Sequence, residues 1–407
     1  MNRRKFLTLG STLALSCGTQ RAWSADLLFN SCLPGGLPDA LRNHELVLAA
    51  WDGIDPAQYW DCHTHLLGVG DSNNGTWINP HLRSLLHPVK RAQFAFYLNA
   101  ACVTQDQNIN DQFVARLRML LEELPIGAKA MLLAFDYYHD EDGRPNLQRS
   151  TFHTPNEYAM QLAQRIPERF EWIASIHPYR PDAVETLNTA IAGGARAVKW
   201  LPPAMAIDPS SPRCDAFYAT LARHNIPLLT HAGHEHAVDA AELQRLGNPL
   251  LLRRALDHGV RVIIAHCASL GASADVDNGA HGPQVPNIEL FARLMRESRY
   301  AKHLFGDISA ITQINRSDAT LRRIFTERDW HPRLVNGSDY PLPGIVPLFW
   351  LRGFVRKGYL TRADAEVLAQ IRSHNALLFD FLLKRRLTIT GATLPPSVFQ
   401  TRARFLA

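Results

Sequence analysis

Eight short apolar segments, each separated from the next by a longer amphipathic segment, limit the fold of this chain most strongly. The apolar segments are rich in Ala, Val, Ile and Leu and do not alternate cleanly with polar residues, which is typical of parallel strands buried on both faces. They are Tyr59–Leu67, Ala128–Phe135, Trp172–His177, Ala195–Leu201, Pro227–His231, Val260–His266, His303–Ile308 and Arg333–Gly337.

The segments between them place apolar residues three and four positions apart, as amphipathic helices do. These predicted helices are Asn156–Arg165, Asp182–Ala192, Asp215–His224, Pro249–Asp257, Asn287–Glu297, Ser317–Phe325 and Arg362–Ile371. Alternating strands and helices in this number predict an α/β fold, a (β/α)₈ TIM barrel. An open doubly wound sheet is the alternative, but the sequence lacks the Gly-rich phosphate loops that often accompany it.

The barrel is predicted to span residues 58–385. An N-terminal extension over residues 26–57 precedes it, and an insertion over Gly68–Asn110 follows the first strand, where it could form a lid. A short C-terminal tail, residues 386–407, is expected to pack on the barrel.

Residues 1–25 have the pattern of an export signal. Arg3 and Arg4 precede an apolar stretch, Phe6–Cys17, that is too short to span a membrane but suits a signal peptide. The pattern resembles a twin-arginine signal and predicts export, with the bacterial periplasm as the expected compartment. Lipoprotein processing at Cys17 and an uncleaved amphipathic start are the alternatives. We expect no membrane span.

The net charge does not indicate a nucleic-acid partner. The formal net charge is +5, and four of these charges lie in the leader, on Arg3, Arg4, Lys5 and Arg21. The remaining chain therefore carries about +1, whereas nucleic-acid binding needs a concentrated positive face. A small molecule is the expected partner.

The six cysteines do not form a C-x-x-C pair, so a cysteine zinc site is not expected. Five remain beyond the leader, and this odd number means that at least one is free or paired outside the chain. Cys62 and Cys267 each lie beside a candidate metal ligand, and we interpret both as small buried strand residues.

Metal-binding residue types occur where the predicted strands end. In a parallel barrel, catalytic side chains come from the C-terminal ends of the strands. His63 and His65 close the first strand and, two residues apart, share one face. A single H-x-H motif is a weak signal by itself.

Four further strands end in the same way. Lys199 closes the fourth strand, His231 the fifth and His266 the sixth, while Asp339 follows the eighth. Alone, each has a structural interpretation: a satisfied core histidine, or a lysine that binds substrate or pairs with Asp339. Together at one end of a barrel, these residues favour a metal centre.

This set resembles the amidohydrolase superfamily. The segments Asp307-Ile308-Ser309 and Gly337-Ser338-Asp339-Tyr340-Pro341 are similar to its amidohydrolase-related branch, and the similarity covers residues 58–385. That branch contains hydrolases and also aminocarboxymuconate-semialdehyde-decarboxylase-like enzymes.

The resemblance implies a divalent metal, with zinc expected, bound by His63, His65, His231 and Asp339. It makes His266 either a ligand of a second metal or a histidine that polarises the substrate. Lys199 matches the carbamylated lysine of dinuclear members, which the mononuclear decarboxylase-like pattern does not require. The number of ions, one or two, stays open.

We therefore expect a metal-dependent hydrolase that acts on an ester, lactone, amide or phosphoester, with Asp339 as proton acceptor and His266 as the second catalytic residue. The substrate-pocket candidates, chosen by position alone, are His177, Asp136, Tyr138, Trp200 and Tyr340. His234 and His236 stay unassigned.

Three other functions compete with this one. A metal-dependent decarboxylase is the main alternative, followed by an exported metal-binding protein without catalytic activity. A serine hydrolase would use Ser269 in Cys267-Ala268-Ser269-Leu270-Gly271, but the first Gly of a nucleophile elbow is absent.

Overall fold

The computed structural model describes residues 28–104, 108–279 and 281–406, so the predicted leader lies outside the described residues. Eight strands follow one another in chain order and pair in parallel. They are β1 (Trp60–His65), β3 (Lys129–Leu133), β5 (Phe170–Ile173), β6 (Val198–Trp200), β7 (Leu228–His231), β8 (Val262–Ala265), β11 (Leu304–Asp307) and β12 (Leu334–Val335).

Two seams join the three-stranded and five-stranded sheets that these strands form. Between β5 and β6, Ala174 pairs in parallel with Val198. Between β12 and β1, the amide of Cys62 donates to the carbonyl of Asn336 at 3.1 Å, and Thr64 pairs with Tyr340. Backbone pairing therefore passes through all eight strands and returns to β1, which agrees with the predicted (β/α)₈ TIM barrel.

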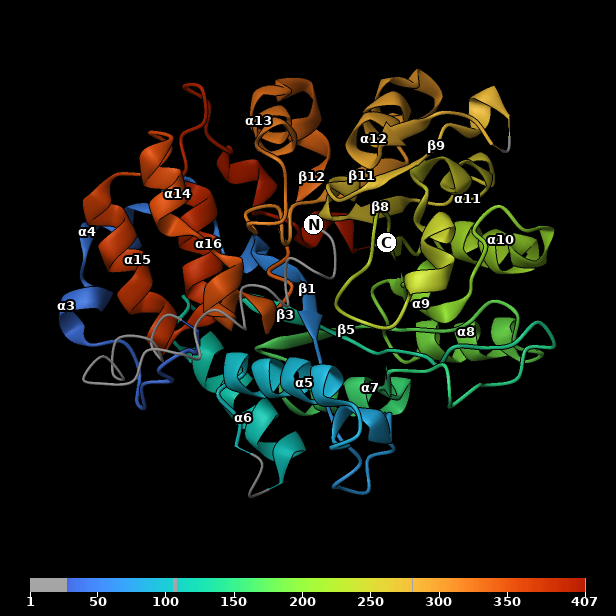
Figure 1. The fold of residues 1–407 in the computed structure, drawn as a ribbon, viewed down its shortest axis with the longest axis horizontal. Coiled ribbons are helices and arrows are strands. Elements are labelled where there is room, and N and C mark those ends of the chain that lie inside the picture. The colour runs from blue at the N-terminus through green and yellow to red at the C-terminus, as the bar shows by residue number, and fades with distance from the viewer. Residues whose placement is uncertain (1–27, 105–107, 280, 407) are drawn as a thin grey trace.

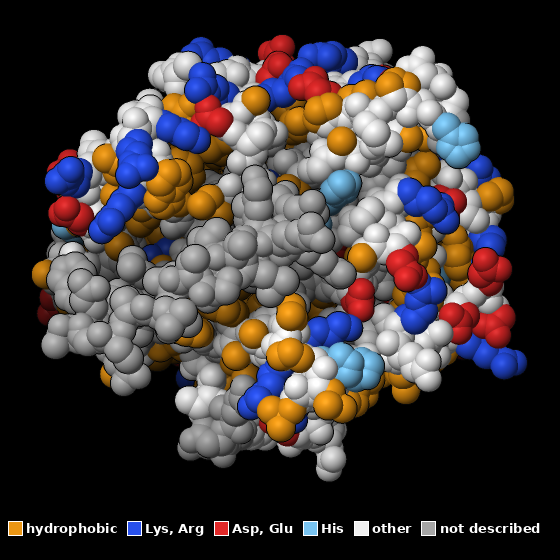
Figure 2. All heavy atoms as spheres, viewed as in Figure 1, with side chains coloured by type: hydrophobic (Ala, Val, Ile, Leu, Met, Phe, Trp, Pro, Cys, Tyr) orange, Lys and Arg blue, Asp and Glu red, His pale blue; other side chains and the backbone are white. Residues whose placement is uncertain are grey.

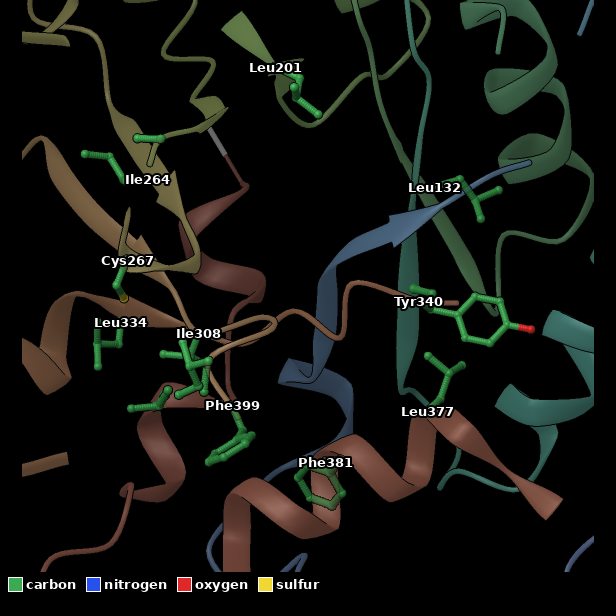
Figure 3. Packing of buried hydrophobic residues seen from close by; sticks show 14 of the residues in the cluster. Leu132, Leu201, Ile264, Cys267, Ile308, Leu334, Tyr340, Leu377, Phe381 and Phe399 are labelled. Atoms are coloured by element: carbon green, nitrogen blue, oxygen red, sulfur yellow. The ribbon is translucent and has the colours of Figure 1, made fainter. Parts of the chain in front are cut away.

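Both faces of the strands are buried, which explains why their sequences do not alternate between apolar and polar residues. On β8, Val262 and Ile264 belong to the large outer cluster that packs against the helices. Ile263 and Ala265 belong to a smaller inner cluster, together with Leu229 of β7. Figure 3 shows part of the outer cluster, including Ile264. Alternate residues therefore face the helices and the interior.

The helices surround the strands (Figure 1). Those that follow the strands are α6 (Ile109–Glu122), α7 (Asn156–Arg165), α8 (Ala183–Ala192), α9 (Pro202–Met205), α10 (Asp215–Arg223), α11 (Arg253–Asp257), α12 (Asn287–Arg296), α13 (Asp318–Thr326), α14 (Leu351–Arg356), α15 (Arg362–His374) and α16 (Ala376–Arg386). Apolar spacing predicted six of these within a few residues. The predicted helix Pro249–Asp257 is split into a 3₁₀ turn, Pro249–Leu252, and α11.

The third predicted strand is displaced from its position in the structure. The sequence predicted Trp172–His177, whereas β5 covers Phe170–Ile173, where it pairs with β3. Beyond Ala174 the chain leaves the ladder, because the amide of Ser175 donates to the side chain of Asn156 and its hydroxyl donates to the carbonyl of Lys199.

The N-terminal extension forms two short helices, α3 (Asp39–Arg42) and α4 (Glu45–Ala49), on the outer layer of the barrel. Trp51, which follows α4, packs its ring 4.6 Å from that of Phe381 on α16. A disulfide joins Cys32 to Cys102, at the end of the insertion. The extension is therefore tied covalently to the insertion.

The insertion after β1 contains a short strand, β2 (Trp77–Ile78), and a long helix, α5 (Pro88–Ala100). β2 pairs with β4 (Phe152–His153), and a second antiparallel pair joins β9 (Ala272–Ala274) to β10 (Gln284–Pro286). The hydroxyl of Tyr97 on α5 donates to the carbonyl of Ala237 at 2.6 Å, so α5 contacts the loop that follows β7.

The C-terminal tail closes the opposite end of the strands. Its Phe405 belongs to the inner cluster with Trp60, the first residue of β1. The amide of Trp60 donates to the hydroxyl of Thr401 at 3.1 Å. The tail therefore packs where the strands begin.

Charges of both signs are interspersed on the surface shown in Figure 2. Among the helices that the structure describes, none has the length and apolar character needed to cross a membrane.

Candidate metal centre

Strand β1 carries two histidines to the carboxyl end of the strands. The rings of His63 and His65 lie 5.3 Å apart, because residues two positions apart share a face of a strand. The Nε2 atom of His63 lies 3.5 Å from Oδ1 of Asp339, and that of His65 lies 3.1 Å from the same oxygen. Three atoms that can bind a metal ion therefore meet at one point.

Asp339 reaches this point because the loop after β12 pairs with β1. Its amide donates to the carbonyl of His63 at 2.7 Å. Its φ of +61° is left-handed, a conformation that Asp adopts more readily than most residues. Burial alone would raise the pKa of Asp339, but His63, His266 and His65 lower it well below its usual value. The side chain is thus an ionised carboxylate, the form that binds metals.

Strand β7 and the turn after β8 add His231 and His266. The ring of His266 lies 5.1 Å from that of His63 and 5.3 Å from that of His231. The Nε2 atom of His231 is buried and has no hydrogen-bond partner among the described residues. Burial lowers the pKa of His231 to about 4, so the ring is neutral at neutral pH. A neutral imidazole with a free nitrogen is suited to a divalent metal ion.

Lys199 of β6 joins the same group. Its Nζ atom lies 3.1 Å from Nε2 of His63, the nitrogen that also faces Asp339. The side chain is 1% exposed, and this burial lowers the pKa of its ammonium group. The structure therefore brings together all six ligand candidates: His63, His65, Lys199, His231, His266 and Asp339.

Asp307 and Ser309 hold two of these histidines from the other side. Nδ1 of His63 lies 2.8 Å from Oδ2 of Asp307, and Nδ1 of His266 lies 2.8 Å from the hydroxyl of Ser309. Burial would raise the pKa of Asp307, but the hydrogen bond and charge of His63 and the charge of His266 contribute to lowering it to about 2. Because Nδ1 of each ring is engaged, Nε2 is left for a ligand.

His63, His266 and Asp307 form a second group whose potential ligand atoms lie close together. Asp307 approaches His63 at Nδ1, whereas Asp339 approaches Nε2. We therefore assign Asp307 to orienting the ring, and Asp339 to the metal set.

A buried network fixes the loop that carries Asp339. Nζ of Lys384 on α16 donates to the carbonyl of Gly337 at 2.7 Å and also pairs with Asp380. Oδ1 of Asp61 accepts from the amide of Ser338 at 2.8 Å. Helix α16 and strand β1 thus hold the loop from both sides.

Four histidines, an ionised carboxylate and a lysine with a lowered pKa fit a divalent metal ion, and the unpartnered Nε2 of His231 supports this fit. A model of the amidohydrolase family matches residues 60–379, most of the chain. The chain belongs to the amidohydrolase family. The resemblance inferred from the sequence is therefore confirmed, and the protein is a member of a metal-dependent enzyme family.

Solved structures that are similar to this amidohydrolase have low sequence identity to it. A TIM-barrel protein from Bordetella bronchiseptica is 13% identical with a TM-score of 0.45, covering 79% of this chain and 99% of that one. A 5-carboxyvanillate decarboxylase from Novosphingobium aromaticivorans, with bound manganese, is 12% identical with a TM-score of 0.44, and the match covers 79% of this chain and 96% of that one. A 4-oxalomesaconate hydratase from Rhodopseudomonas palustris is 15% identical with a TM-score of 0.38, covering 80% and 96%. No curated protein matches the sequence.

Three predicted pocket residues make structural contacts in this amidohydrolase. Nε2 of His177 lies 2.8 Å from the carbonyl of Met205, and this ring is fully buried. Asp136 accepts from the amide of His177 at 2.9 Å and from the guanidinium of Arg180 at 3.2 Å. Tyr138 stacks against an arginine of its own loop. A role for these side chains in substrate binding stays a prediction.

Trp200 and Tyr340 pack in the outer hydrophobic cluster. The indole nitrogen of Trp200 donates to the carbonyl of Ile176, and its ring packs against that of Phe217. The ring of Tyr340 lies 5.6 Å from that of Phe113 on α6, and Figure 3 shows Tyr340 among the buried side chains. Each directly follows a candidate ligand, and the contacts observed for both are packing contacts of the outer layer.

The loop after β7 has an acidic residue that the sequence analysis did not single out. Oε2 of Glu235 lies 3.4 Å from Nδ1 of His231. Nε2 of His234 lies 2.9 Å from the carbonyl of Ala272, so its contact is with the neighbouring loop. Burial lowers the pKa of His236, and the charge of Glu235 opposes this shift. The i, i+4 spacing of His231 and Glu235 is visible in the sequence, but it gave no indication that their side chains would meet.

Among the described residues, no base contacts the serine of the competing hydrolase hypothesis. The hydroxyl of Ser269 is buried and has no hydrogen-bond partner in the described part of the chain. Cys62 and Cys267 are buried free thiols, as the sequence indicated. Burial raises the pKa of both thiols well above the usual value, so neither is a thiolate ligand at neutral pH.

Proposed function

We propose that this amidohydrolase is a metal-dependent hydrolase of a small molecule with an ester, lactone, amide or phosphoester bond. The observation that carries the proposal is the meeting of the Asp339 carboxylate with the Nε2 atoms of His63 and His65. A carboxylate at this place can bind a metal ion and can also accept a proton.

The ligand set supports zinc as the ion, because imidazole and carboxylate are usual zinc ligands. His63, His65, His231 and Asp339 would hold the first ion. In this site the ion would acidify water and polarise the bond to be cleaved.

The side chains have separate tasks in the proposed reaction. Asp339 accepts a proton from the attacking water at a carboxylate oxygen and later gives it to the leaving group. His266 faces the same side as Asp339, with Nε2 4.0 Å from Oδ2, and it polarises the substrate or holds a second ion. Asp307 and Ser309 keep the rings of His63 and His266 in the orientation that leaves Nε2 free.

Lys199 supports a site with two ions. Burial favours the neutral amine, which can add to carbon dioxide, forming an N–C bond and releasing a proton. The resulting carbamate has two oxygens that could bridge two ions. We propose this modification for Lys199.

We also propose that the protein is exported through its twin-arginine leader. The Cys32–Cys102 disulfide supports this proposal, because disulfides persist in oxidising compartments such as the periplasm. Cell fractionation of the wild type and of Arg3→Lys/Arg4→Lys tests it. Periplasmic protein is expected for the wild type and retention in the cytoplasm for the variant.

Metal content tests the enzymatic proposal. Elemental analysis measures the metal content of the purified wild type and of Lys199→Ala. We expect about two ions per chain in the wild type and one or none in the variant. Lys357→Ala removes an exposed lysine and serves as the control. Turnover of a panel of esters, lactones, amides and phosphoesters should stop when a chelator removes the metal.

Other outcomes distinguish the competing functions. A single ion unaffected by Lys199→Ala, with carbon dioxide released from an aromatic or unsaturated acid, would identify a decarboxylase. An intact metal site without turnover of any substrate would favour a binding protein. Folded protein without metal would contradict the proposal altogether.

A further inference from the structure

Arg316 lies at the end of the loop that joins β11 to α13. The loop follows Asp307, the last residue of β11, and contains Ser309; these two residues orient His63 and His266. The amide of Arg316 donates to the carbonyl of Gln313 at 3.0 Å, and the amide of Ile314 donates to the carbonyl of Leu348 at 2.8 Å. Backbone bonds therefore fix the position of Arg316 relative to the metal set.

The guanidinium group of Arg316 lacks an acidic partner. Its Nε atom is buried and has no hydrogen-bond partner within the described residues, and the group forms no ion pair with any of them. Of the described residues, Nη1 bonds only to the side-chain amide oxygen of its neighbour, Asn315, at 3.2 Å. A buried hydrogen-bond donor without a partner costs free energy, and it costs more when the donor belongs to a charged group than when it is neutral. A ligand that accepts a hydrogen bond from such a donor therefore gains affinity.

The charge of Arg316 acts on the metal set. Burial is the main cause that lowers the pKa values of His231 and His236, and the charge of Arg316 adds to this lowering. The carboxylates of Asp339 and Glu235 raise the pKa of Arg316 against the effect of its burial. Burial lowers the pKa of Arg316 to about 10, so the group is still cationic at neutral pH.

Both nearby carboxylates are already engaged elsewhere. Oε1 of Glu235 accepts from the backbone amides of Ala237 and Val238, while its other oxygen faces His231. Asp339 faces the histidines of the metal set. Neither carboxylate is therefore free to pair with the cation, and no other described residue forms an ion pair with it.

We propose that Arg316 binds a carboxylate of the substrate and thereby restricts this enzyme to small organic acids. The inference rests on the proposed function, because it places this carboxylate beside the bond that is cleaved at the metal set. A planar guanidinium can bind a carboxylate through two parallel hydrogen bonds, which fixes orientation as well as position.

Two neighbours on the same loop support an anion or a polar group at this place. The hydroxyl of Thr312 and the side-chain nitrogen of Gln313 are buried and lack hydrogen-bond partners in the described chain. Unsatisfied buried polar atoms are rare in folded proteins and require an explanation. Three of them between residues 312 and 316, on the loop that follows β11, are consistent with a site that a polar ligand completes.

Binding of paired probes to the metal-loaded protein tests the inference. Each dicarboxylate (isophthalate, phthalate and glutarate) is compared by calorimetry with its half-amide, in which one carboxylate is replaced by a neutral amide. In both probes one carboxylate can bind the metal. The ratio of the two affinities therefore measures how much the second carboxylate contributes to binding. The variants are Arg316→Gln, Arg316→Lys and, as control, Arg322→Gln on α13, which removes an exposed arginine.

We expect the wild type and Arg322→Gln to prefer at least one dicarboxylate over its half-amide by about tenfold or more. Arg316→Gln should reduce this preference to within about twofold without changing metal content, and Arg316→Lys should keep part of it. A preference that survives in Arg316→Gln, or no preference in the wild type, would overturn the inference. Elemental analysis of the same samples reports separately on the metal centre.

Discussion

The Nδ1 atom of His63 lies 2.8 Å from a carboxylate oxygen of Asp307, on the side of the ring opposite Asp339. This contact joins β1 to β11 across the interior of the barrel. It selects the tautomer of His63 in which Nε2 is free to bind a metal ion. The hydroxyl of Ser309 contacts Nδ1 of His266 and likewise leaves Nε2 of that ring free.

Asp307→Ala should weaken metal binding by about 10- to 100-fold, because a ligand histidine without its orienting partner loses both position and basicity. Competition with a chelator measures the affinity. Asp307→Asn keeps an oxygen that can accept a hydrogen bond from Nδ1, so this variant should lose less metal affinity than Asp307→Ala. Equal affinity in the wild type and Asp307→Ala would show that His63 does not need this partner.

Gly337→Ala should disturb the metal centre although residue 337 has no ligand atom. A Cβ at this position would lie 2.4 Å from Cβ of His63 and 2.9 Å from Oδ1 of Asp307, so one of them must move. Overpacking of this kind costs roughly 1–3 kcal/mol. We expect a lower melting temperature and weaker metal binding.

Gly193→Ala is the matched control. Its new Cβ would meet Sδ of Met160, the flexible end of a side chain that can rotate away. Metal affinity should not change in this variant. A normal metal affinity in Gly337→Ala would contradict the prediction.

Asp380 on α16 should make stability depend on pH. Burial raises the pKa of its carboxyl to about 7, against the lowering effect of Lys384 on the same helix, while Asp61 on β1 and Asp307 on β11 raise it further. Between about pH 4 and pH 7 the folded protein keeps a proton that the unfolded chain has lost. Stability contributed by the protonated form is therefore lost as the pH rises, by up to about 1.4 kcal/mol per pH unit.

Urea unfolding of the wild type and Asp380→Asn at several pH values checks this. The amide cannot ionise, so the free energy of unfolding of the wild type should fall relative to that of the variant between pH 4 and pH 7, and level off above it. A constant difference across this range would mean that the carboxyl titrates at its usual value. Metal-free protein should be used, so that pH-dependent metal binding does not contribute.

The Cys32–Cys102 disulfide should stabilise the protein through the long loop that it closes. With a sequence separation of 70, the loop-entropy relation gives about 4 kcal/mol as the upper estimate. Cys32→Ser/Cys102→Ser should lower the free energy of unfolding, and reductant should lower that of the wild type but not that of the variant.

Thiol titration provides an independent check on this pairing. Unfolded protein that starts at residue 26 should show three free thiols without reductant, from Cys62, Cys214 and Cys267, and five after reduction. Five thiols without reductant would contradict the disulfide.

Several helices with one buried face and one exposed face were predicted well from the sequence. Helix α6 also has both faces but was not predicted. The helix Asn156–Arg165 has the predicted bounds, because its apolar residues recur at helical spacing. Helix α16 was not predicted, because it is buried on nearly every side between the extension and the barrel and so lacks an amphipathic pattern. The contact of Trp51 with Phe381 contributes to this burial.

The ligand candidates were visible in the sequence because chemistry limits which residue types can bind a metal and the barrel limits where they can lie. His63, His65, Lys199, His231, His266 and Asp339 each occur at the end of a strand, and the parallel ladder brings those ends together. The pocket candidates were chosen by position alone, without a pattern to support them. Trp200 and Tyr340 instead pack in the outer layer.

By itself the sequence determined the eight strands, with β5 displaced, six of the helices and the residue types at the strand ends, since these depend on local periodicity and on metal chemistry. Tertiary structure alone decided which atoms meet. The approach of Asp307 to His63, the unpaired charge of Arg316 and the Cys32–Cys102 disulfide each depend on how segments far apart in the chain are placed. Local residue patterns do not encode that placement, because it follows from the packing of the whole barrel.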